Sequence, residues 1–518
     1  MLIPPIIDAL LVPAAFPEDP GSITLAQTHV SYLIFTDRFV YKIKKPVDFG
    51  FLDFTTIEKR LFFCEEEVRL NSRLAPGVYL GVVKVVSIGG EIKIEREGEA
   101  IEYAVKMKRL ASESMLERAL EKGEVPEEVI RRVARVVAAF HAEAEVNEHI
   151  ASFGLPEFVS KNTSENFIQT RPFIGRTISN ALYERLKYWT EGFLDRNGDL
   201  FRVRAGGGFV RDCHGDIHSG HISIVDGINI IDCIEFNERF RHSDIVADMA
   251  FLSMDLDYHN RRDLSRAFDD EYFRASKDAE GARLLDFYKC YRAYVRGKVE
   301  GFKSTEKEVP EGERLSSELS ARYHFHLAGL YASRWRPTVI IMRGLSGTGK
   351  STLARMIADV TNLAILSTDN IRKVLAGLKP TDKARAKYGE GIYSTEFTER
   401  TYIEMIDRAA ALLAQGRSVI LDATFSKARH AEEARMSALK AGARSHIIEC
   451  VAGDDAVKGR FLKRDAECAM KGIPVSDAGW EVYLKQKEIY EAVRPDIMVN
   501  SERPFGESLS RLFEEIFG

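Results

Sequence analysis

A glycine-rich segment carries the clearest chemical signal in the sequence: Gly344–Ser351 reads GLSGTGKS and matches the pattern GxxxxGK[ST]. It follows a β-branched apolar run and precedes a helix-like stretch. Glycines let the backbone N–H groups of such a loop turn inward around phosphates, and the dipole of the following helix favours negative charge. Lys350 is expected to reach the β- and γ-phosphates, and the Ser351 hydroxyl to bind Mg²⁺. The residues expected to hold ATP or GTP are Gly344, Ser346, Gly347, Thr348, Gly349, Lys350, Ser351 and Thr352.

The next strand-like run ends in STDNIR, residues 367–372. An aspartate at the carboxyl end of a strand can orient and deprotonate an acceptor hydroxyl, so Asp369 is the candidate general base. Arg372, three residues further along the expected helix, is the candidate clamp for the acceptor. The alternative is an aspartate that caps the helix and an arginine on the surface.

Two more groups could act on the same nucleotide. Asp422 ends the apolar run of the segment VILDATF, where it could hold Mg²⁺ or its waters, contact the acceptor, or cap a helix. Arg460 and Arg464 lie four residues apart, on one face of an expected helix. They could stabilise charge on the transferring phosphoryl group, or lie on a solvated helix face.

A second constellation lies far upstream, where residues 211–232 read RDCHGDIHSGHISIVDGINIID. The HGD triplet and the hydrophobic run that ends in aspartate resemble aminoglycoside phosphotransferases and other protein-kinase-like small-molecule kinases. The resemblance implies that Asp216 accepts the hydroxyl proton and that Asp232 holds Mg²⁺. The family usually has asparagine at the second metal position, where this chain has His221. Histidine is a poorer ligand for Mg²⁺ than oxygen groups are.

The segment Phe39–Lys44, FVYKIK, resembles the strand whose lysine contacts the ATP phosphates in these kinases. Strand alternation puts Lys42 and Lys44 on one face, and Lys42 is the preferred candidate. Glu67, in a glutamate triplet expected to open a helix, is the candidate partner of this lysine. No GxGxxG pattern precedes the strand, and Gln27–Ser31 is expected to form the equivalent turn.

The elements that must position these groups follow two different patterns. Five apolar runs of the C-terminal part are expected to be buried strands: Thr338–Met342, Ala364–Ser367, Ser418–Leu421, Ser445–Val451 and Asp496–Val499. Helix-like stretches separate them, and this alternation predicts a parallel sheet with ligands at the carboxyl ends of its strands. The N-terminal part instead has strand-like segments first and long helix-like segments later, which favours a two-lobed α+β unit.

These patterns predict two domains. Residues 1–300 are expected to form a protein-kinase-like α+β fold, with an N-lobe over about 1–110 and a C-lobe over about 111–300. Residues 301–335 are expected to be a linker and a bracing helix, and 336–518 an α/β P-loop domain.

The C-terminal part resembles the small P-loop kinases, a group that includes gluconate kinase, zeta toxins and polynucleotide 5′-kinase. The whole chain resembles bacterial fusions of an aminoglycoside-phosphotransferase-like domain with a P-loop kinase. The resemblance implies Mg²⁺-dependent phosphorylation of an acceptor hydroxyl, with two nucleotide sites in one chain.

Three readings of the function stay open. The acceptor could be a small molecule, or the 5′-hydroxyl of a nucleic acid that a basic stretch would track. That stretch comprises Lys373, Lys379, Lys383, Arg385 and Lys387, which could equally belong to a charged lid. In the third reading the N-terminal domain binds nucleotide or regulates without turnover.

Composition excludes several other classes. The 518 residues carry a net charge of −5, so no overall basic field recruits nucleic acid. The six cysteines are scattered without a CxxC pair, which fits reduced thiols better than disulfides or a zinc site. Without a basic leader or a long apolar run, the chain is expected to be cytoplasmic, with no membrane partner; a homo-oligomer is compatible with the sequence.

Overall fold

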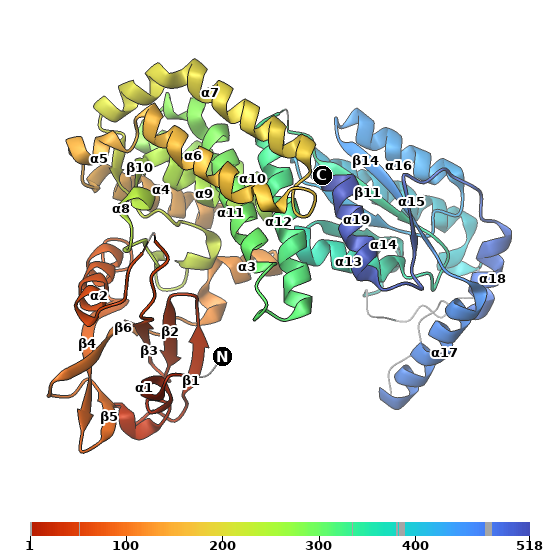
Figure 1. Ribbon diagram of the computed structural model, residues 1–518. Helices are drawn as coiled ribbons and strands as arrows, with labels where there is room; N and C mark the ends of the chain where they lie inside the picture. The colour runs from red at the N-terminus through yellow and green to blue at the C-terminus, as the bar shows by residue number, and fades with distance from the viewer. Residues whose placement is uncertain (1–2, 51, 334, 380–381, 383–388, 472–478) are drawn as a thin grey trace. The chain divides into compact units, whose positions relative to one another are not determined.

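The computed structural model describes residues 3–50, 52–333, 335–379, 382, 389–471 and 479–518 (Figure 1). Contacts divide the chain into two compact units. Unit 1 comprises Met1–Glu165, Thr190–Asp255 and Leu264–Arg292, and unit 2 comprises Asn166–Trp189, Leu256–Asp263 and Ala293–Gly518. The expected domain limits at residues 300 and 335 stay a prediction.

Unit 1 begins with a six-stranded antiparallel sheet in the order β1-β2-β3-β6-β4-β5. Its strands are β1 (Thr24–Gln27), β2 (Ser31–Phe35), β3 (Phe39–Lys44), β4 (Tyr79–Ile88), β5 (Glu91–Ile94) and β6 (Ala100–Lys108). Alternation along β3 puts Tyr41 and Ile43 into a hydrophobic core, which leaves Lys42 and Lys44 on the other face. β1 and β2 form a hairpin, so the turn expected near Gln27–Ser31 is present.

Helix α2 (Ile57–Asn71) packs against β4 and β6 of this sheet. Thr56 caps it, because the Thr56 side chain accepts a hydrogen bond from the N–H of Lys59 at 3.3 Å. The expectation that the glutamate triplet at 65–67 opens the helix is wrong: the helix begins at Ile57. Glu67 consequently lies well inside α2, on its buried side.

The rest of unit 1 is mostly helical, with two short antiparallel pairs that carry the HGD segment. The pairs are β7 (Val210–Asp212) with β10 (His242–Asp244) and β8 (Ile222–Ser223) with β9 (Asn229–Ile230). The main helices here are α4 (Glu127–Glu143), α7 (Asn180–Gly206), α9 (Ile245–Tyr258), α10 (Arg262–Ser276) and α11 (Leu285–Lys303), of which all but α4 also contain residues of unit 2. A sheet lobe followed by a helical lobe is the protein-kinase-like fold predicted from the sequence, and this prediction is confirmed.

Unit 2 contains a five-stranded parallel sheet in the order β12-β13-β11-β14-β15. Its strands are β11 (Thr338–Arg343), β12 (Ala364–Ser367), β13 (Val419–Asp422), β14 (Arg444–Val451) and β15 (Ile497–Asn500). Every residue of the central strand β11 is buried, in keeping with the apolar run at residues 339–342 that makes up most of it. The α/β P-loop fold predicted for this part is confirmed.

Helices surround this sheet and connect its strands. They are α13 (Lys350–Thr361), α14 (Thr368–Leu375), α15 (Thr395–Ala414), α16 (Ala428–Lys440), α17 (Asp454–Lys471), α18 (Trp480–Glu488) and α19 (Phe505–Phe517). The expected bracing helix is α12 (Glu311–Tyr331), which packs against α13 and α19. His326 of α12 contacts the main-chain oxygen of Phe517 at 3.1 Å. In this way α12 becomes part of the core of unit 2.

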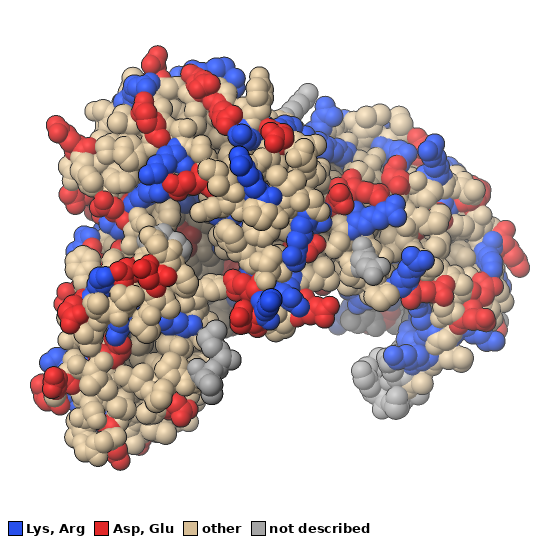
Figure 2. Space-filling view, viewed as in Figure 1, with Lys and Arg blue, Asp and Glu red and all other residues tan. Residues whose placement is uncertain are grey.

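Three general expectations can be compared with the structure. The cysteines whose side chains it describes, Cys64, Cys213, Cys233, Cys290 and Cys450, are buried free thiols. Across the described residues, no helix combines the length and apolarity needed to cross a bilayer. Figure 2 shows basic and acidic side chains intermixed on the face in view, in keeping with the small net charge.

Candidate functional site

The loop after β11 can form only with glycine at several positions. Gly344, Gly347 and Gly349 have φ angles of 138°, 82° and 92°, which side chains of other residues rarely permit. A Cβ atom at Gly344 would lie 2.4 Å from the carbonyl oxygen of Cys450. At Gly347 it would lie 2.9 Å from side-chain atoms of Phe461 and Val457. The loop is therefore packed too closely against neighbouring atoms for larger residues at these positions. Its glycines allow the tight turn that a phosphate-binding loop needs.

The remaining loop residues complete this turn. Thr348 is buried, and its hydroxyl donates to the Leu345 carbonyl at 2.8 Å. Lys350 Nζ lies 3.3 Å from the same carbonyl oxygen. Burial lowers the pKa of Lys350, while the nearby Asp422 carboxylate favours its charged form. Ser351 and Thr352 are exposed in the first turn of α13.

A pocket of about 980 Å³ opens at this loop. Its lining includes four residues of the glycine-rich segment, Ser346, Gly347, Lys350 and Ser351. Because β12 and β13 are parallel neighbours, their carboxyl ends bring Asp369 and Asp422 to the same pocket. The hydroxyl and carboxylate oxygens of Ser351 and Asp422 are the ligand type that Mg²⁺ prefers, so this donor set fits that ion.

Asp369 and Arg372 both line the pocket, on the first two turns of α14. The Asp369 carboxylate is about half exposed, and Lys373 Nζ lies 3.0 Å from it. Arg372 is buried, and its guanidinium donates to the Ile392 carbonyl at 2.7 Å and the Thr398 hydroxyl at 3.0 Å. The base role of Asp369 and the clamp role of Arg372 stay predictions.

The two arginines of α17 are placed differently. Arg460 donates to the carbonyl oxygen of Gly347 at 3.0 Å and to that of Ser501 at 2.6 Å, so it braces the loop from outside. Arg464 lines the pocket and lies 3.6 Å from Asp465. Of the two, Arg464 is the one that reaches the space where a triphosphate would lie. Their roles in transfer stay predictions.

Two features of the pocket are not apparent from the sequence. The Gln486 side-chain oxygen accepts the backbone N–H of Ser346 at 3.0 Å, from a helix 140 residues away. Glu399 of α15 faces His430 at 3.0 Å and also pairs with Arg429, and both Glu399 and His430 line the pocket. No local spacing predicts either feature, since the first joins the loop to α18 and the second joins α15 to α16. Of the basic stretch, only Lys373 and Lys379 lie within the described residues.

Unit 1 holds a second ionic site, on the face of β3 opposite its core. Lys42 Nζ lies 2.8 Å from both Glu67 and Asp232, as the kinase resemblance predicts for a lysine–glutamate pair. Lys44, the other candidate, contacts Glu67 at 2.7 Å and also pairs with Glu235. Glu67 therefore binds both lysines at once.

The charges of this site depend on one another. Burial disfavours the Lys42 ammonium, but Asp232, Glu67 and Glu235 outweigh it and hold the pKa of Lys42 well above its usual value. Burial likewise opposes the charge of Asp232, while Lys42 and His221 keep the pKa of this carboxyl low. Burial raises the pKa of Glu235. The described carboxylates around the two lysines thus neutralise them within the protein.

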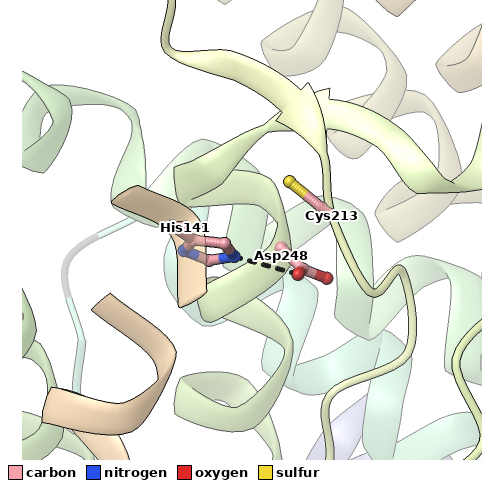
Figure 3. A group of neighbouring side chains, drawn as sticks. All are labelled: His141, Cys213 and Asp248. Carbon is pink, nitrogen blue, oxygen red and sulfur yellow. Dashed lines mark hydrogen bonds and ion pairs between the residues drawn. The ribbon is translucent and has the colours of Figure 1, made fainter. Parts of the chain in front are cut away.

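The HGD loop is fixed by Asp248 of α9. Its carboxylate accepts the backbone N–H groups of His214 at 2.9 Å and Gly215 at 2.7 Å. His141 lies 3.0 Å from the same carboxylate, with Cys213 beside them (Figure 3). We interpret this group as a support for the loop and not as a metal site. The Asp248 carboxylate is already used by several donors, and burial raises the pKa of the Cys213 thiol, which disfavours the thiolate that a metal needs. Asp216 is thereby presented at a partly exposed position.

Comparisons with known proteins agree with the P-loop assignment. A family model described as an AAA domain, AAA_33, matches residues 339–488. The uncharacterized protein Rv2004c of Mycobacterium tuberculosis (strain ATCC 25618 / H37Rv) is 32% identical over 449 residues, which cover 86% of this chain and 87% of that protein. The uncharacterized protein Mb2027c of Mycobacterium bovis matches to the same extent.

Solved structures similar to parts of the chain have low sequence identity. The Mycobacterium tuberculosis APS kinase CysC is 18% identical, covers 35% of this chain and 99% of its own, and has a TM-score of 0.26. A choline/ethanolamine kinase family protein from Mesorhizobium loti is 9% identical, covers 63% of this chain and 99% of its own, and has a TM-score of 0.37.

Proposed function

The chain belongs to the same family as the mycobacterial protein Rv2004c, and for its P-loop domain we propose ATP-dependent transfer of a phosphoryl group to an acceptor hydroxyl. The observation that carries the proposal is the pocket of about 980 Å³. It extends from the phosphate loop past Asp369 to Glu399 and His430. An enzyme that only hydrolyses ATP needs room for water, whereas this volume also accommodates a second substrate.

The loop supports this proposal through its own groups. Its backbone N–H groups and the N-terminus of α13 would hold the phosphates, and the Lys350 ammonium would bind their oxygens. When Mg²⁺ is bound, it neutralises charge on the β- and γ-phosphates, and the Ser351 hydroxyl and Asp422 carboxylate are the groups that would hold it. Arg464 lines the same space and would stabilise charge on the moving phosphoryl group.

Asp369 would receive the proton of the acceptor hydroxyl. Its carboxylate is exposed to the pocket, and it lies in the first turn of a helix whose N-cap is Ser367. Lys373, four residues on, contacts this carboxylate at 3.0 Å and would help to hold its orientation. Arg372 would act on the acceptor after exchanging one of its present partners.

A small acceptor is favoured over a nucleic acid. Lys373 is held by Asp369 at 3.0 Å, so one of the two described lysines of the basic stretch is paired within the site. The far end of the pocket also mixes Glu399 with His430 and Lys427, which suits hydrogen bonds to a polar small molecule better than a phosphate backbone.

The test is a transfer screen with the full chain. Isotopically labelled ATP and Mg²⁺ are offered with sugars, nucleosides, aminoglycosides or 5′-hydroxyl oligonucleotides, and labelled product is measured. The proposal requires a product that wild type forms and the Lys350→Ala variant does not. Transfer to no acceptor of any class, with hydrolysis alone, would reject it.

The kinase-like site of unit 1 supports a second candidate, a second phosphotransferase or a nucleotide-binding regulator. The observation that favours it is the linkage of Lys42 to Glu67 and Asp232. Asp216→Asn and Lys350→Ala variants separate the two sites. If only Lys350→Ala abolishes transfer, unit 1 has a regulatory or supporting role.

A further inference from the structure

An imidazole stands at the second metal position of the kinase-like site. His221 ends the short 3₁₀ turn η4 (Ser219–His221), and its Nδ1 lies 3.0 Å from the main-chain oxygen of Asp216. A carbonyl oxygen only accepts, so in the neutral ring Nδ1 carries the proton and Nε2 keeps its lone pair. This backbone contact is how proteins prepare a histidine to bind a metal through Nε2.

The lone pair of His221 faces a carboxylate. Nε2 lies 3.6 Å from the Asp232 Oδ2 atom, while the other Asp232 oxygen binds Lys42. Two ligands that each lie about 2.1 Å from one metal, at an angle near 109°, are about 3.4 Å apart. The observed separation therefore suits a single ion held between these two atoms.

A second carboxylate and a second imidazole stand next to this pair. Asp216, His218 and His221 offer ligand atoms that all lie within 4.8 Å of one another. The Asp216 Oδ2 atom is 3.5 Å from Nδ1 of His221, the ring nitrogen that does not face Asp232. His218 Nδ1 accepts the N–H of Gly220 at 3.2 Å, so His218 is better placed to support the site than to bind through that nitrogen.

The surrounding charge favours a cation. Lys42 and Lys44 face three carboxylates, Glu67, Asp232 and Glu235. Burial raises the pKa of Glu235 and so favours its neutral form, which leaves Glu67 and Asp232 to balance the two lysines, and Asp216 adds one negative charge beside them. A divalent ion at Asp232 and His221 would balance this excess.

The kinase resemblance implies Mg²⁺ at this position, but the residues present do not suit that ion. Mg²⁺ prefers an octahedron of oxygen atoms, whereas imidazole suits transition metals such as Zn²⁺, Fe²⁺ and Ni²⁺. We infer that unit 1 binds a divalent transition-metal ion through His221 Nε2 and the Asp232 carboxylate, with Asp216 beside them, in preference to Mg²⁺. The inference concerns unit 1 alone and stands or falls independently of transfer by the P-loop domain.

The chain offers a matched control for this site. His149, Glu238 and His242 form another group whose ligand atoms lie within 4.8 Å of one another in unit 1. His149 and Glu238 are exposed, and they already contact each other at 3.2 Å. A His149→Ala variant therefore tests whether an observed metal binds at this second group instead.

The experiment uses the full chain, freed of metal by chelation and without nucleotide, and titrates it with Co²⁺ while its visible absorption is recorded. Calorimetry with Mg²⁺ gives the competing affinity. We expect one Co²⁺ per chain, bound at least about tenfold more weakly in His221→Ala and Asp232→Asn, and unchanged within about twofold in His149→Ala.

A His221→Asn variant sharpens the test, because it restores the oxygen ligand usual in this class of kinase. Co²⁺ affinity should fall at least about tenfold and Mg²⁺ affinity should rise, while circular dichroism shows an unchanged fold. The inference is overturned if the wild-type chain binds no Co²⁺, if it binds Mg²⁺ as tightly, or if His221→Ala leaves Co²⁺ binding intact.

Discussion

The P-loop site and the kinase-like site each set lysine among carboxylates, but they differ in how many carboxylates contact each lysine. At the P-loop, Lys350 is partly exposed beside one carboxylate, Asp422, and lines an open pocket. In unit 1, Lys42 and Lys44 are already paired with Glu67, Asp232 and Glu235. We propose that an anion such as a triphosphate completes the first arrangement and that a cation completes the second. The same residue types can therefore prepare opposite ligands, and only their partners tell which.

Replacing the proposed base of the P-loop site should have the largest effect. Asp369→Asn keeps the size of the side chain but removes the proton acceptor, so transfer should fall by about 10²- to 10⁴-fold while ATP binding is kept. Single-turnover transfer and equilibrium binding measure the two quantities. As a control, Asp359→Asn alters another aspartate of unit 2, on α13, outside the residues that line the pocket. Normal transfer by the Asp369 variant would remove this residue from the base role.

Removing the shared carboxylate of the kinase-like site should lower the free energy of unfolding. Glu67→Ala leaves the buried Lys44 and the partly buried Lys42 short of a partner, and breaking a buried pair costs about 3–5 kcal/mol in free energy of unfolding. The neighbouring Glu66→Ala removes only a surface contact with Arg69, worth about 0.2–1 kcal/mol. Denaturant unfolding of both variants measures the difference. Equal losses would mean that the lysines of unit 1 do not depend on Glu67.

Salt should separate the two classes of acceptor. If the acceptor is small, its apparent affinity should change less than about threefold between 50 and 200 mM salt. A protein that makes roughly 6–10 phosphate contacts to DNA loses about 10³- to 10⁵-fold over the same range. Steady-state transfer at several salt concentrations gives the slope, and a steep one would favour a nucleic-acid 5′-hydroxyl.

The smallest effect is expected at the base position of unit 1. If the P-loop site alone carries out the main transfer, Asp216→Asn should leave that rate within about twofold of wild type, because Asp216 belongs to the other unit. The same labelled-ATP assay measures it. A loss as large as that of Asp369→Asn would show that both sites contribute to one reaction and would end the contrast drawn above.

The parts of the site that sequence analysis could predict are those set by local patterns. The glycines of the loop adopt positive φ angles that favour glycine, so the motif itself predicts the turn. Strand β11 is predicted by the apolar run just before it. Asp369 and Asp422 reach the same pocket because parallel strands end at one edge of a sheet. For these residues, the order of strands and motifs along the chain is enough to predict that they share one site.

Contacts between distant elements could not be predicted in this way. The bond from Ser346 to Gln486 joins residues 140 apart, and the pairing of Lys44 with Glu235 joins residues 191 apart. Which carbonyl Arg460 or Arg372 binds depends on how helices pack, since an arginine pattern alone fits several partners. The sequence predicts that the helix around Glu67 starts at the glutamate triplet, whereas α2 starts at Ile57. The threonine that caps it, Thr56, is only a weak sequence signal for a helix start.

Direct binding of Mg²⁺–ATP to the full chain is the most decisive measurement. Calorimetry on wild type, Lys350→Ala and the matched surface variant Lys440→Ala should show saturable binding in wild type and in Lys440→Ala. Binding should be lost or weakened at least about 10²-fold in Lys350→Ala, because its ammonium is the one cation of the loop itself. No binding by the wild-type chain, or full binding by Lys350→Ala, would contradict the account.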